Sequence, residues 1–419
     1  MKAEEQKAVV IGAGVLGLST ALFLQRAGVP TAVIDALPPA GGASFGNAGM
    51  ISPDSAIPVA LPGMLPKVPG WLMDPLGPLA VAPAHFIKAL PWFARWLDAG
   101  RMSRVIAISD AMRALHKETL DCWHELIGAQ AMDEMVHKNG QIRLLDSAPE
   151  NLPALQQELY RRHRIKTEAL TVDDLRQMLP GLAPHVTHGL LLPDNAYTHN
   201  PARLVKLVGE RFVAAGGEIR AERVLKILPG GARGDGGGRY TIMTNIDNHV
   251  AAYVVVAAGA WSKELLKPLG IDVPLETERG YHVMLPDHGL DIRRTISVSS
   301  GGFGVTTMEH GLRIAGTVEF AGLARPPNER RAYVLIEKAR KIFPGLNTDR
   351  PKIWMGHRPS TPDSLPIVGE ASGHPGLYLA FGNAHFGMTG GPPSGRMIAN
   401  MITKRPQPVD PHPYRPGRF

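Results

Sequence analysis

Three glycines near the start of the chain, Gly12, Gly14 and Gly17, have the spacing G-x-G-x-x-G. In this spacing the first glycine permits a tight turn, the second lets backbone amides approach a pyrophosphate, and the third lets a helix pack against a strand. The free N–H groups and the positive end of the helix dipole then hold the anion. Asp35 follows about twenty residues later, where a carboxylate binds a ribose hydroxyl. The pattern predicts a site for a redox dinucleotide.

A second set of residues could bind and position a substrate. Arg358 lies in the block GHRPSTPD, and a guanidinium offers two parallel donors that match a carboxylate and stays charged. A surface arginine paired with Asp363 is the alternative interpretation. Tyr281, in ERGYHV, could donate to the same carboxylate, or it could be a core tyrosine. These residues suggest a binding site for a substrate carboxylate.

Four histidines raise the question of proton transfer. His282, His357 and His385 lie in the same blocks and could include a base, whereas His199, in YTHNP, better suits a loop or capping role. No paired carboxylates, no His/Cys set with metal-ligand spacing and no Ser-His-Asp order stands out. We therefore expect no metal site.

These residues need a scaffold, and the hydrophobic pattern predicts mixed strands and helices. An apolar run at 9–11, helical spacing up to Gly28 and a β-run at 31–34 give strand, glycine turn, helix and strand. Prolines are so dense between 55 and 97 that we expect no long helix there, only an irregular packed excursion with tryptophans. Further helices are predicted at 103–127, 151–162, 172–179, 200–215 and 328–343, strands at 140–145, 216–228 and 253–262, an antiparallel sheet at 275–318, a glycine-rich hairpin end at 230–238, and small-residue loops at 41–53, 353–369 and 377–402.

The composition of the 419-residue chain, 44% hydrophobic and 20% charged, is ordinary for a soluble globular enzyme. A net charge of +7 could favour acidic substrates or anionic lipid, but no nucleic-acid-binding module is present. The single cysteine, Cys122, excludes an internal disulfide and suits a reducing compartment. No apolar run reaches the roughly 18 residues of a membrane span. We therefore expect a cytoplasmic protein that binds no nucleic acid.

Five blocks taken together resemble a known family. The glycine motif, SFGNAGMISP, VVVAAGAWS, GHRPSTPDSLPIVG and the terminal GNAHFGMT and GRMIANMI are similar, in this order, to the D-amino acid oxidase family of flavoproteins. The resemblance is closest to its bacterial D-amino acid dehydrogenase branch and covers nearly the whole chain. It implies FAD as the resident cofactor and Arg358 as the anchor of the substrate carboxylate. Asp35 and Asn383 depart from relatives that have Glu and His at these positions.

The resemblance also implies which residues contact each part of FAD. They are Gly12, Gly14, Val15, Leu16 and Gly17 at the diphosphate, Asp35 at the ribose, Ser44, Asn47, Ala48, Gly49 and Met50 at the diphosphate and flavin, Val224 at adenine, Ala258, Gly259 and Trp261 in a second wall, and Gly382, Asn383, His385, Gly387, Met388 and Thr389 along the isoalloxazine.

The implied fold is a two-domain α/β flavoprotein. A Rossmann-like FAD-binding domain is expected from 1–55, 196–274 and 352–419, and a substrate domain of antiparallel sheet and helices from 56–195 and 275–351. The implied activity is FAD-dependent oxidative deamination of a D-amino or imino acid, by hydride transfer to flavin N5 without a required base. Three alternatives remain open: a D-hydroxyproline or D-proline dehydrogenase, a glycine- or sarcosine-type oxidase, and a noncatalytic FAD-containing electron-transfer subunit.

The electron acceptor is expected to be quinone-like rather than oxygen. The dehydrogenase resemblance, the positive net charge and the tryptophans at 55–97 together suggest peripheral contact with the inner face of the cell membrane. Because Cys122 lies in a predicted helix far from the flavin blocks, FAD is expected to bind noncovalently.

Overall fold

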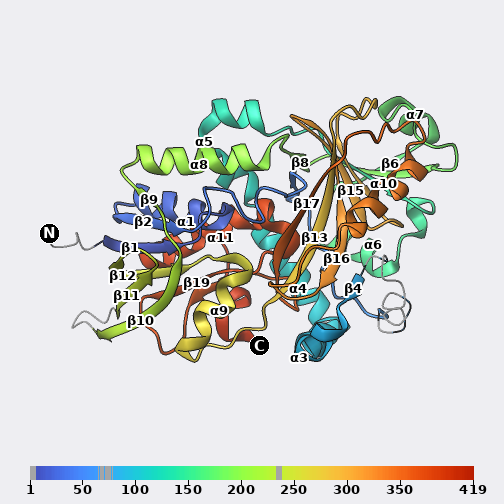
Figure 1. Cartoon of the computed structure of the whole chain (residues 1–419). Helices are drawn as coiled ribbons and strands as arrows, with labels where there is room; N and C mark the ends of the chain where they lie inside the picture. The colour runs from blue at the N-terminus through green and yellow to red at the C-terminus, as the bar shows by residue number, and fades with distance from the viewer. Residues whose placement is uncertain (1–5, 65, 67–69, 71–76, 78, 233–237) are drawn as a thin grey trace.

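The computed structural model describes residues 6–64, 66, 70, 77, 79–232 and 238–419. Two large β-sheets stand side by side, and helices cover their outer faces (Figure 1). The sheet on the left of Figure 1 contains the N-terminal strand; the sheet on the right is largely antiparallel. This is the mixed α/β architecture that the sequence predicts.

Among the described residues, the first sheet has eight strands, in the order β10-β11-β12-β1-β2-β9, with β19 beside β12 and β18 beside β19. The strand bounds are β1 (Gln6–Ile11), β2 (Thr31–Asp35), β9 (Glu218–Ala221), β10 (Val224–Ala232), β11 (Gly238–Thr244), β12 (Asn248–Val256), β18 (Ile367–Glu370) and β19 (Leu377–Phe381). β1 pairs in parallel with β2 and β12. Val9, Val10 and Val33 are buried, as in parallel strands covered on both faces.

The second sheet has nine strands in the described part of the chain, in the order β17-β13-β16-β15-β14-β5-β7-β6, with β4 beside β16. The strand bounds are β4 (Leu79–Val81), β5 (Gln141–Leu145), β6 (Glu168–Leu170), β7 (His188–Leu192), β13 (Glu276–Leu285), β14 (Thr295–Val298), β15 (Phe303–Met308), β16 (Gly311–Phe320) and β17 (Lys352–Ser360), while β3 (Met50–Ile51) and β8 (Ala196–Tyr197) pair separately. The antiparallel sheet predicted at 275–318 is confirmed by β13, β16, β15 and β14.

The described helices cover these sheets. Their bounds are α1 (Val15–Arg26), α3 (Pro83–Ala99), α4 (Met102–His116), α5 (Thr119–Met135), α6 (Ala154–Arg162), α7 (Val172–Met178), α8 (Pro201–Ala214), α9 (Ser262–Leu266), α10 (Arg330–Ile342) and α11 (Gly387–Ile402), with short 3₁₀ turns η2 (Pro149–Asn151), η3 (Gly259–Trp261), η4 (Lys267–Leu269), η5 (Ala384–Phe386), η6 (His412–Tyr414) and η7 (Pro416–Arg418). Asn200 caps α8, as predicted, because its Oδ1 accepts from Arg203 N at 2.9 Å.

The expectation that prolines exclude a long helix between 55 and 97 is wrong. The 17-residue helix α3 begins at Pro83, in the first turn where proline is tolerated, and contains Pro91 on its exposed side. Its two tryptophans, Trp92 and Trp96, are buried in the core rather than presented to a surface. Trp71, which the same expectation included, lies outside the described residues.

Two continuous sequence patterns are interrupted in the structure. The helical run at 103–127 divides into α4 and α5. The strand expected at 216–228 divides at Glu222 into β9 and β10, which lie at opposite ends of the first sheet's strand order. Glu222 is buried and hydrogen-bonds Thr244 Oγ1 at 2.6 Å and His249 Nε2 at 2.7 Å, so polar contacts fix the break.

The loops expected at 353–369 and 377–402 are also wrong, since most of these residues form β17, β18, β19 and α11. Small residues at the end of the chain serve close packing. A Cβ at Gly395 of α11 would lie 2.8 Å from Thr20 N in α1, so only glycine lets these helices approach so closely. Within the described residues, no helix is both long and apolar enough to cross a membrane.

Candidate active site

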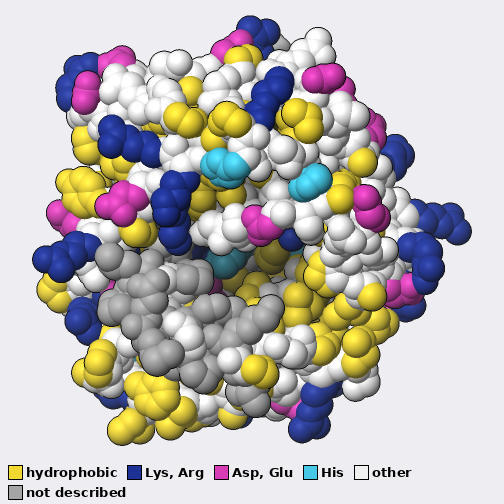
Figure 2. All heavy atoms as spheres, turned by 90° about the vertical axis from the view of Figure 1, so that its right-hand side faces the viewer, with side chains coloured by type: hydrophobic (Ala, Val, Ile, Leu, Met, Phe, Trp, Pro, Cys, Tyr) yellow, Lys and Arg dark blue, Asp and Glu magenta, His cyan; other side chains and the backbone are white. Residues whose placement is uncertain are grey.

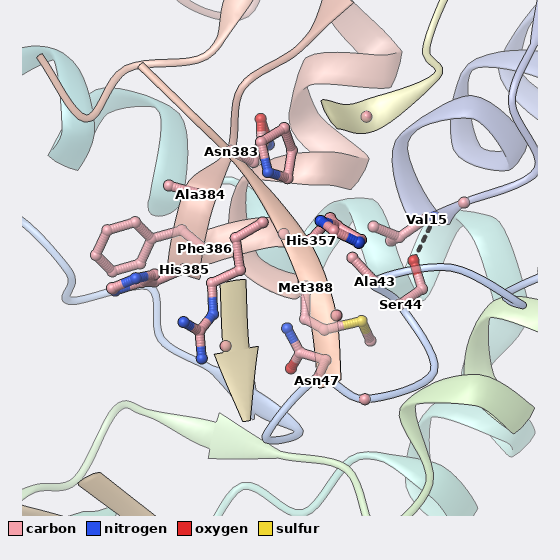
Figure 3. A pocket seen from close by; sticks show the side chains of 18 of the residues that line it. Val15, Ala43, Ser44, Asn47, His357, Asn383, Ala384, His385, Phe386 and Met388 are labelled. Carbon is pink, nitrogen blue, oxygen red and sulfur yellow. Dashed lines mark hydrogen bonds between the residues drawn. The ribbon is translucent and has the colours of Figure 1, made fainter. Parts of the chain in front are cut away.

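A cavity of about 1070 Å³ is lined by residues of both sheets, and Figure 3 shows part of its wall. It exceeds the roughly 300–1,000 Å³ of sites for single small ligands, so it has room for a dinucleotide and a substrate. Most of the predicted site residues line it: Gly12, Gly14, Val15, Leu16, Asp35, Ser44, Asn47, Ala48, Met50, Val224, Ala258, Gly259, Trp261, Tyr281, Arg358, Gly382, Asn383, His385, Gly387 and Met388.

Three predicted site residues are not part of the cavity wall. A Cβ at Gly17 would lie 1.9 Å from Gly12 O, so this glycine serves the packing of α1 against the turn. Gly49 has φ +77° and lies against Thr198 O. Thr389 Oγ1 accepts from Ser52 N at 3.0 Å. These residues shape the segments behind the wall.

The glycine turn has the form that an anion site requires. Gly12 has φ +118°, and a Cβ there would lie 2.3 Å from Ala257 O, so no other residue fits. α1 begins directly after this turn at Val15, whose N–H donates to Ser44 Oγ at 3.0 Å (Figure 3). The N-cap residue Gly14 offers no side-chain cap of its own. Gly14, Val15 and Leu16 line the cavity, so the positive end of the helix dipole faces it and favours a diphosphate there.

Asp35 stands at the end of β2, as the sequence predicts, and lines the same cavity. Its Oδ2 accepts from Ala13 N at 2.7 Å, and its Oδ1 accepts from Leu37 N at 2.8 Å. These bonds hold the carboxylate beside the glycine turn. Each oxygen keeps a lone pair for the hydroxyls of a ribose.

The far end of the wall fits the flavin of FAD. Asn383 precedes η5 and is buried, yet neither its Oδ1 nor its Nδ2 has a hydrogen-bond partner. A buried amide lacking both a donor and an acceptor partner is costly, and a ring edge bearing N–H and carbonyl groups would satisfy it. Asn383, Met388 and His357 all line this cavity and are labelled in Figure 3. The glycine cradle, Asp35 and Asn383 together fit FAD.

Arg358 projects from β17 across the neighbouring strand β13. A Cβ at Gly280 would lie 2.1 Å from Arg358 Cζ, so the guanidinium lies directly over this glycine. Its Nη1 donates to Thr317 O on β16 at 3.1 Å, and it forms no ion pair within the described residues. Burial lowers the Arg358 pKa and Glu278 opposes that shift. The predicted alternative pair does not form, because Asp363 accepts from Arg418 Nε at 2.7 Å.

Glu278, which sequence reasoning missed, lies beside Arg358 in the register of β13 and β17. It is buried, accepts from Ser360 Oγ at 2.6 Å and hydrogen-bonds His385 Nε2 at 2.8 Å. Burial raises the Glu278 pKa, but His385, Ser360 and Arg358 outweigh burial and hold it below its ordinary value. The Glu278 carboxylate therefore offsets part of the Arg358 charge from the neighbouring strand. A charged residue within a buried strand was the only sequence signal for it.

Tyr281 is a buried tyrosine whose hydroxyl is already engaged. It donates to Glu319 Oε2 at 2.6 Å and accepts from Asn328 N at 3.0 Å. Burial, followed by the bond to Glu319, raises its pKa to about 12. The Tyr281 hydroxyl proton is already donated to Glu319 and is not available to a substrate carboxylate, so the alternative of a core tyrosine describes this residue better.

The histidines occupy different places. His357 lines the cavity, contacts Thr277 Oγ1 at 2.9 Å through Nδ1, and has a pKa lowered to about 4 by burial. His282 stacks on Trp354 with ring centroids 5.0 Å apart, and burial lowers its pKa to about 3. His199 lies beside the cap of α8, with Nε2 2.9 Å from Tyr197 Oη. His357 and His282 are therefore neutral at neutral pH.

Cys122 is fully buried in the hydrophobic core of α5 and is absent from the cavity wall. Burial raises its pKa to about 12. Within the part of the chain that the structure describes, no three His, Cys, Asp or Glu side chains form a group that could hold a metal ion.

The chain matches known proteins over nearly its whole length. The sequence pattern of the family described as "DAO: FAD dependent oxidoreductase" matches residues 7–401. A D-amino-acid oxidase from Bradyrhizobium diazoefficiens is 35% identical over 424 residues, covering 99% of each chain. A D-amino acid dehydrogenase from Vibrio cholerae is 29% identical and covers 96% of each. The solved structure of L-proline dehydrogenase from P. horikoshii superposes with a TM-score of 0.75 at 18% identity, covering 100% of this chain and 98% of that one.

Proposed function

Because the chain belongs to the DAO family of FAD-dependent oxidoreductases, we propose that it deaminates D-amino or imino acids oxidatively. The observation that carries this proposal is Arg358, a guanidinium at the cavity wall with donors free for a carboxylate. The names of two full-length relatives, a D-amino-acid oxidase and a D-amino acid dehydrogenase, support the D configuration.

The wall divides into parts for the cofactor and for the substrate. Gly12, Gly14 and the first N–H groups of α1 would hold the FAD diphosphate, Asp35 the ribose, and Asn383 the flavin edge. When bound, FAD supplies at N5 a two-electron acceptor for the hydride of the substrate Cα. The predicted contacts of Val224, Trp261 and the remaining wall residues belong to the same proposal.

The chain's own contribution is orientation and exclusion of water. The Arg358 guanidinium grips the substrate carboxylate in two parallel hydrogen bonds, which fixes the direction of the Cα–H bond. Buried Glu278 attracts the Arg358 guanidinium and hydrogen-bonds His385, which lines the cavity. The substrate amine loses its proton before oxidation, and water hydrolyses the resulting imine to an oxo acid and ammonia. A proline-like substrate would leave as a cyclic imine.

A steady-state assay tests this activity. FAD-loaded enzyme is supplied with an artificial dye acceptor and matched D- and L-amino acids. We expect one oxo acid and one ammonium for each two-electron equivalent of dye reduced, with D enantiomers only. Turnover of L enantiomers alone, or of neither, would overturn the proposal.

We also propose that the physiological acceptor is quinone-like and is met at a membrane surface. The exposed apolar side chains of α3 support this: Phe86, Ile87, Leu90 and Leu97 are 40%, 78%, 44% and 39% exposed. Figure 2 shows this end of the molecule, with hydrophobic side chains along its lower edge. An amphipathic helix of this kind lies in the interface of an anionic bilayer, which the net charge of +7 favours.

Two measurements test the acceptor and the surface separately. Enzyme reduced anaerobically should reoxidise quickly with a soluble quinone and slowly with oxygen in a stopped-flow instrument. The double variant Ile87→Glu, Leu90→Glu should lose sedimentation with anionic vesicles while keeping wild-type activity with dye. Fast reoxidation by oxygen with stoichiometric peroxide would contradict the acceptor, and vesicle binding unchanged by the variant would contradict the role of α3.

A further inference from the structure

One lobe of the cavity extends beyond the glycine turn and Asn383 to the far strands of the second sheet. Its wall includes residues 54–57 and 297–299 together with Gln141, Arg143, Tyr160 and Asn195. This lobe contains an arginine that the proposed reaction does not use, Arg143 of β5.

Arg143 is half-buried and makes only neutral contacts. Its Nε donates to Ser299 Oγ at 3.1 Å, and its Nη1 donates to Tyr160 Oη at 3.1 Å. Across the residues that the structure describes, no carboxylate lies within 4.0 Å of it and its Nη2 makes no hydrogen bond. A partly buried guanidinium that faces a cavity without a counter-ion is a binding site for an anion.

The two hydroxyl groups reinforce the guanidinium. Ser299 Oγ accepts from Arg143, and Tyr160 Oη accepts from both Arg143 and Gln156 Nε2, the latter at 3.2 Å. Each hydroxyl therefore keeps its own proton to donate. Arg143 Nη2 and the hydroxyl protons of Ser299 and Tyr160 are therefore three donors in one cluster. A carboxylate has the acceptor oxygens to bind them.

The neighbouring charge in this lobe is already compensated. Asp54 also lines the cavity, but its Oδ1 lies 3.5 Å from Arg113 Nη2. Burial raises the Asp54 pKa, while Arg113 opposes the shift. Asn195 and Gln141 bond to each other through Nδ2 and Oε1 at 3.0 Å. Among the described residues of this lobe, Arg143 is the charged side chain that has no oppositely charged group within 4.0 Å.

Arg143 and Arg358 belong to strands of the same sheet, β5 and β17. Ser297 pairs with Arg143 on β5 and with Gly304 on β15, so these three positions lie side by side on the sheet, and all three residues line the cavity. Arg358 reaches from the opposite side as far as Thr317 on β16. Three strand spacings separate β16 from β5, which corresponds to about 14 Å between their backbones. The distance between the two guanidinium groups is shorter than this, because both arginine side chains extend toward each other. Between them, Gly304 and Ala315 line the cavity without long side chains, and the flexible side chain of Met50 lies over Gly304, where a Cβ would be 2.7 Å from Met50 Cε.

We propose that Arg143, with Ser299 and Tyr160, is a subsite for a carboxylate on the substrate side chain. The preferred substrates are then D-amino acids with an acidic side chain, held by the α-carboxylate at Arg358 and by the second carboxylate at Arg143. This inference rests on the proposed deamination.

The test compares D-glutamate with D-glutamine, which have the same shape but differ in side-chain charge. In the dye assay the wild type should favour D-glutamate. Arg143→Gln should lower kcat/KM for D-glutamate about 10- to 100-fold, the range of a charge-assisted hydrogen bond, through KM rather than kcat. Its kcat/KM for D-glutamine should stay within about twofold, since a neutral amide gains little from a guanidinium charge.

Matched variants separate this role from general effects. Arg293→Gln removes an exposed arginine that pairs with Asp291 outside the cavity, and it should leave both substrates unchanged. Arg143→Lys should recover part of the preference. An unchanged substrate ratio in Arg143→Gln, or an equal loss for both substrates, would overturn the subsite while leaving the deamination standing. A wild type that oxidises no D-amino acid would overturn both.

Discussion

Replacing Gly280 with alanine tests the position of the substrate anchor without touching the anchor itself. An added Cβ would lie 2.1 Å from Arg358 Cζ, so the guanidinium must leave its place over β13. The strand backbone tolerates alanine here, and the displaced group is the far end of a flexible side chain, so the fold should survive. The displacement also breaks the bond from Arg358 Nη1 to Thr317 O.

The expected fall in kcat/KM follows from the displaced contact between Arg358 and the substrate carboxylate. Truncating one partner of a buried, hydrogen-bonded charge pair costs about 2–5 kcal/mol. A displaced guanidinium keeps its charge but loses the fork geometry, so we expect the lower part of this range, about 2–3 kcal/mol. That corresponds to a fall in kcat/KM for D-amino acids of about 30- to 160-fold.

The assay is dye-coupled steady-state kinetics, with FAD affinity measured in parallel by fluorescence titration. Gly345→Ala is the matched control, because a Cβ at Gly345 meets no atom within 4 Å. We expect a raised KM and unchanged FAD binding for Gly280→Ala alone. A folded, FAD-loaded Gly280→Ala enzyme with wild-type KM would refute the placement of the anchor.

Three further outcomes are expected. Asp35→Ala should weaken FAD binding about 10- to 100-fold in equilibrium titration, since it removes the ribose acceptor and leaves Ala13 N and Leu37 N unpaired; equal affinity would contradict the assignment. Cys122→Ala should stay yellow and, like the wild type, should release its FAD on heating, whereas flavin retained by the denatured wild type would contradict noncovalent binding. Burial lowers the pKa of His116 to about 4, so below about pH 6.5 the unfolded chain binds more protons than the folded chain, and the free energy of unfolding should fall by about 3 kcal/mol between pH 6.5 and pH 4. Urea unfolding of His116→Gln should show a flatter pH dependence, and an unchanged slope would refute this.

The local features of the nucleotide site were predictable from sequence. Gly12 must have a positive φ and Asp35 must end a strand, and both requirements are visible in residue type and spacing. The cap at Asn200 is likewise a local signal. Each of these features depends on residues that are neighbours along the chain.

Other features depend on residues distant in sequence. Gly280 matters because Arg358 crosses it from another strand, and Glu278 matters because it pairs in register with that arginine. The glycines of α11 suggest a loop in the sequence, whereas in the structure Gly391 and Gly395 let α11 pack closely against α1. Pro91 suggests a helix end in the sequence, but it lies on the exposed side of α3, and the buried contacts of this helix stabilise it across the proline.

The most direct test of the central claim is the reductive half-reaction. FAD-loaded enzyme is mixed anaerobically with D-glutamate or L-glutamate, and the flavin absorbance near 450 nm is followed in a stopped-flow instrument. The account predicts saturable bleaching by the D enantiomer, no bleaching by the L enantiomer, and a much higher half-saturating concentration in Arg358→Ala. Flavin that stays oxidised with every D-amino acid, or that is bleached equally well without Arg358, would contradict it.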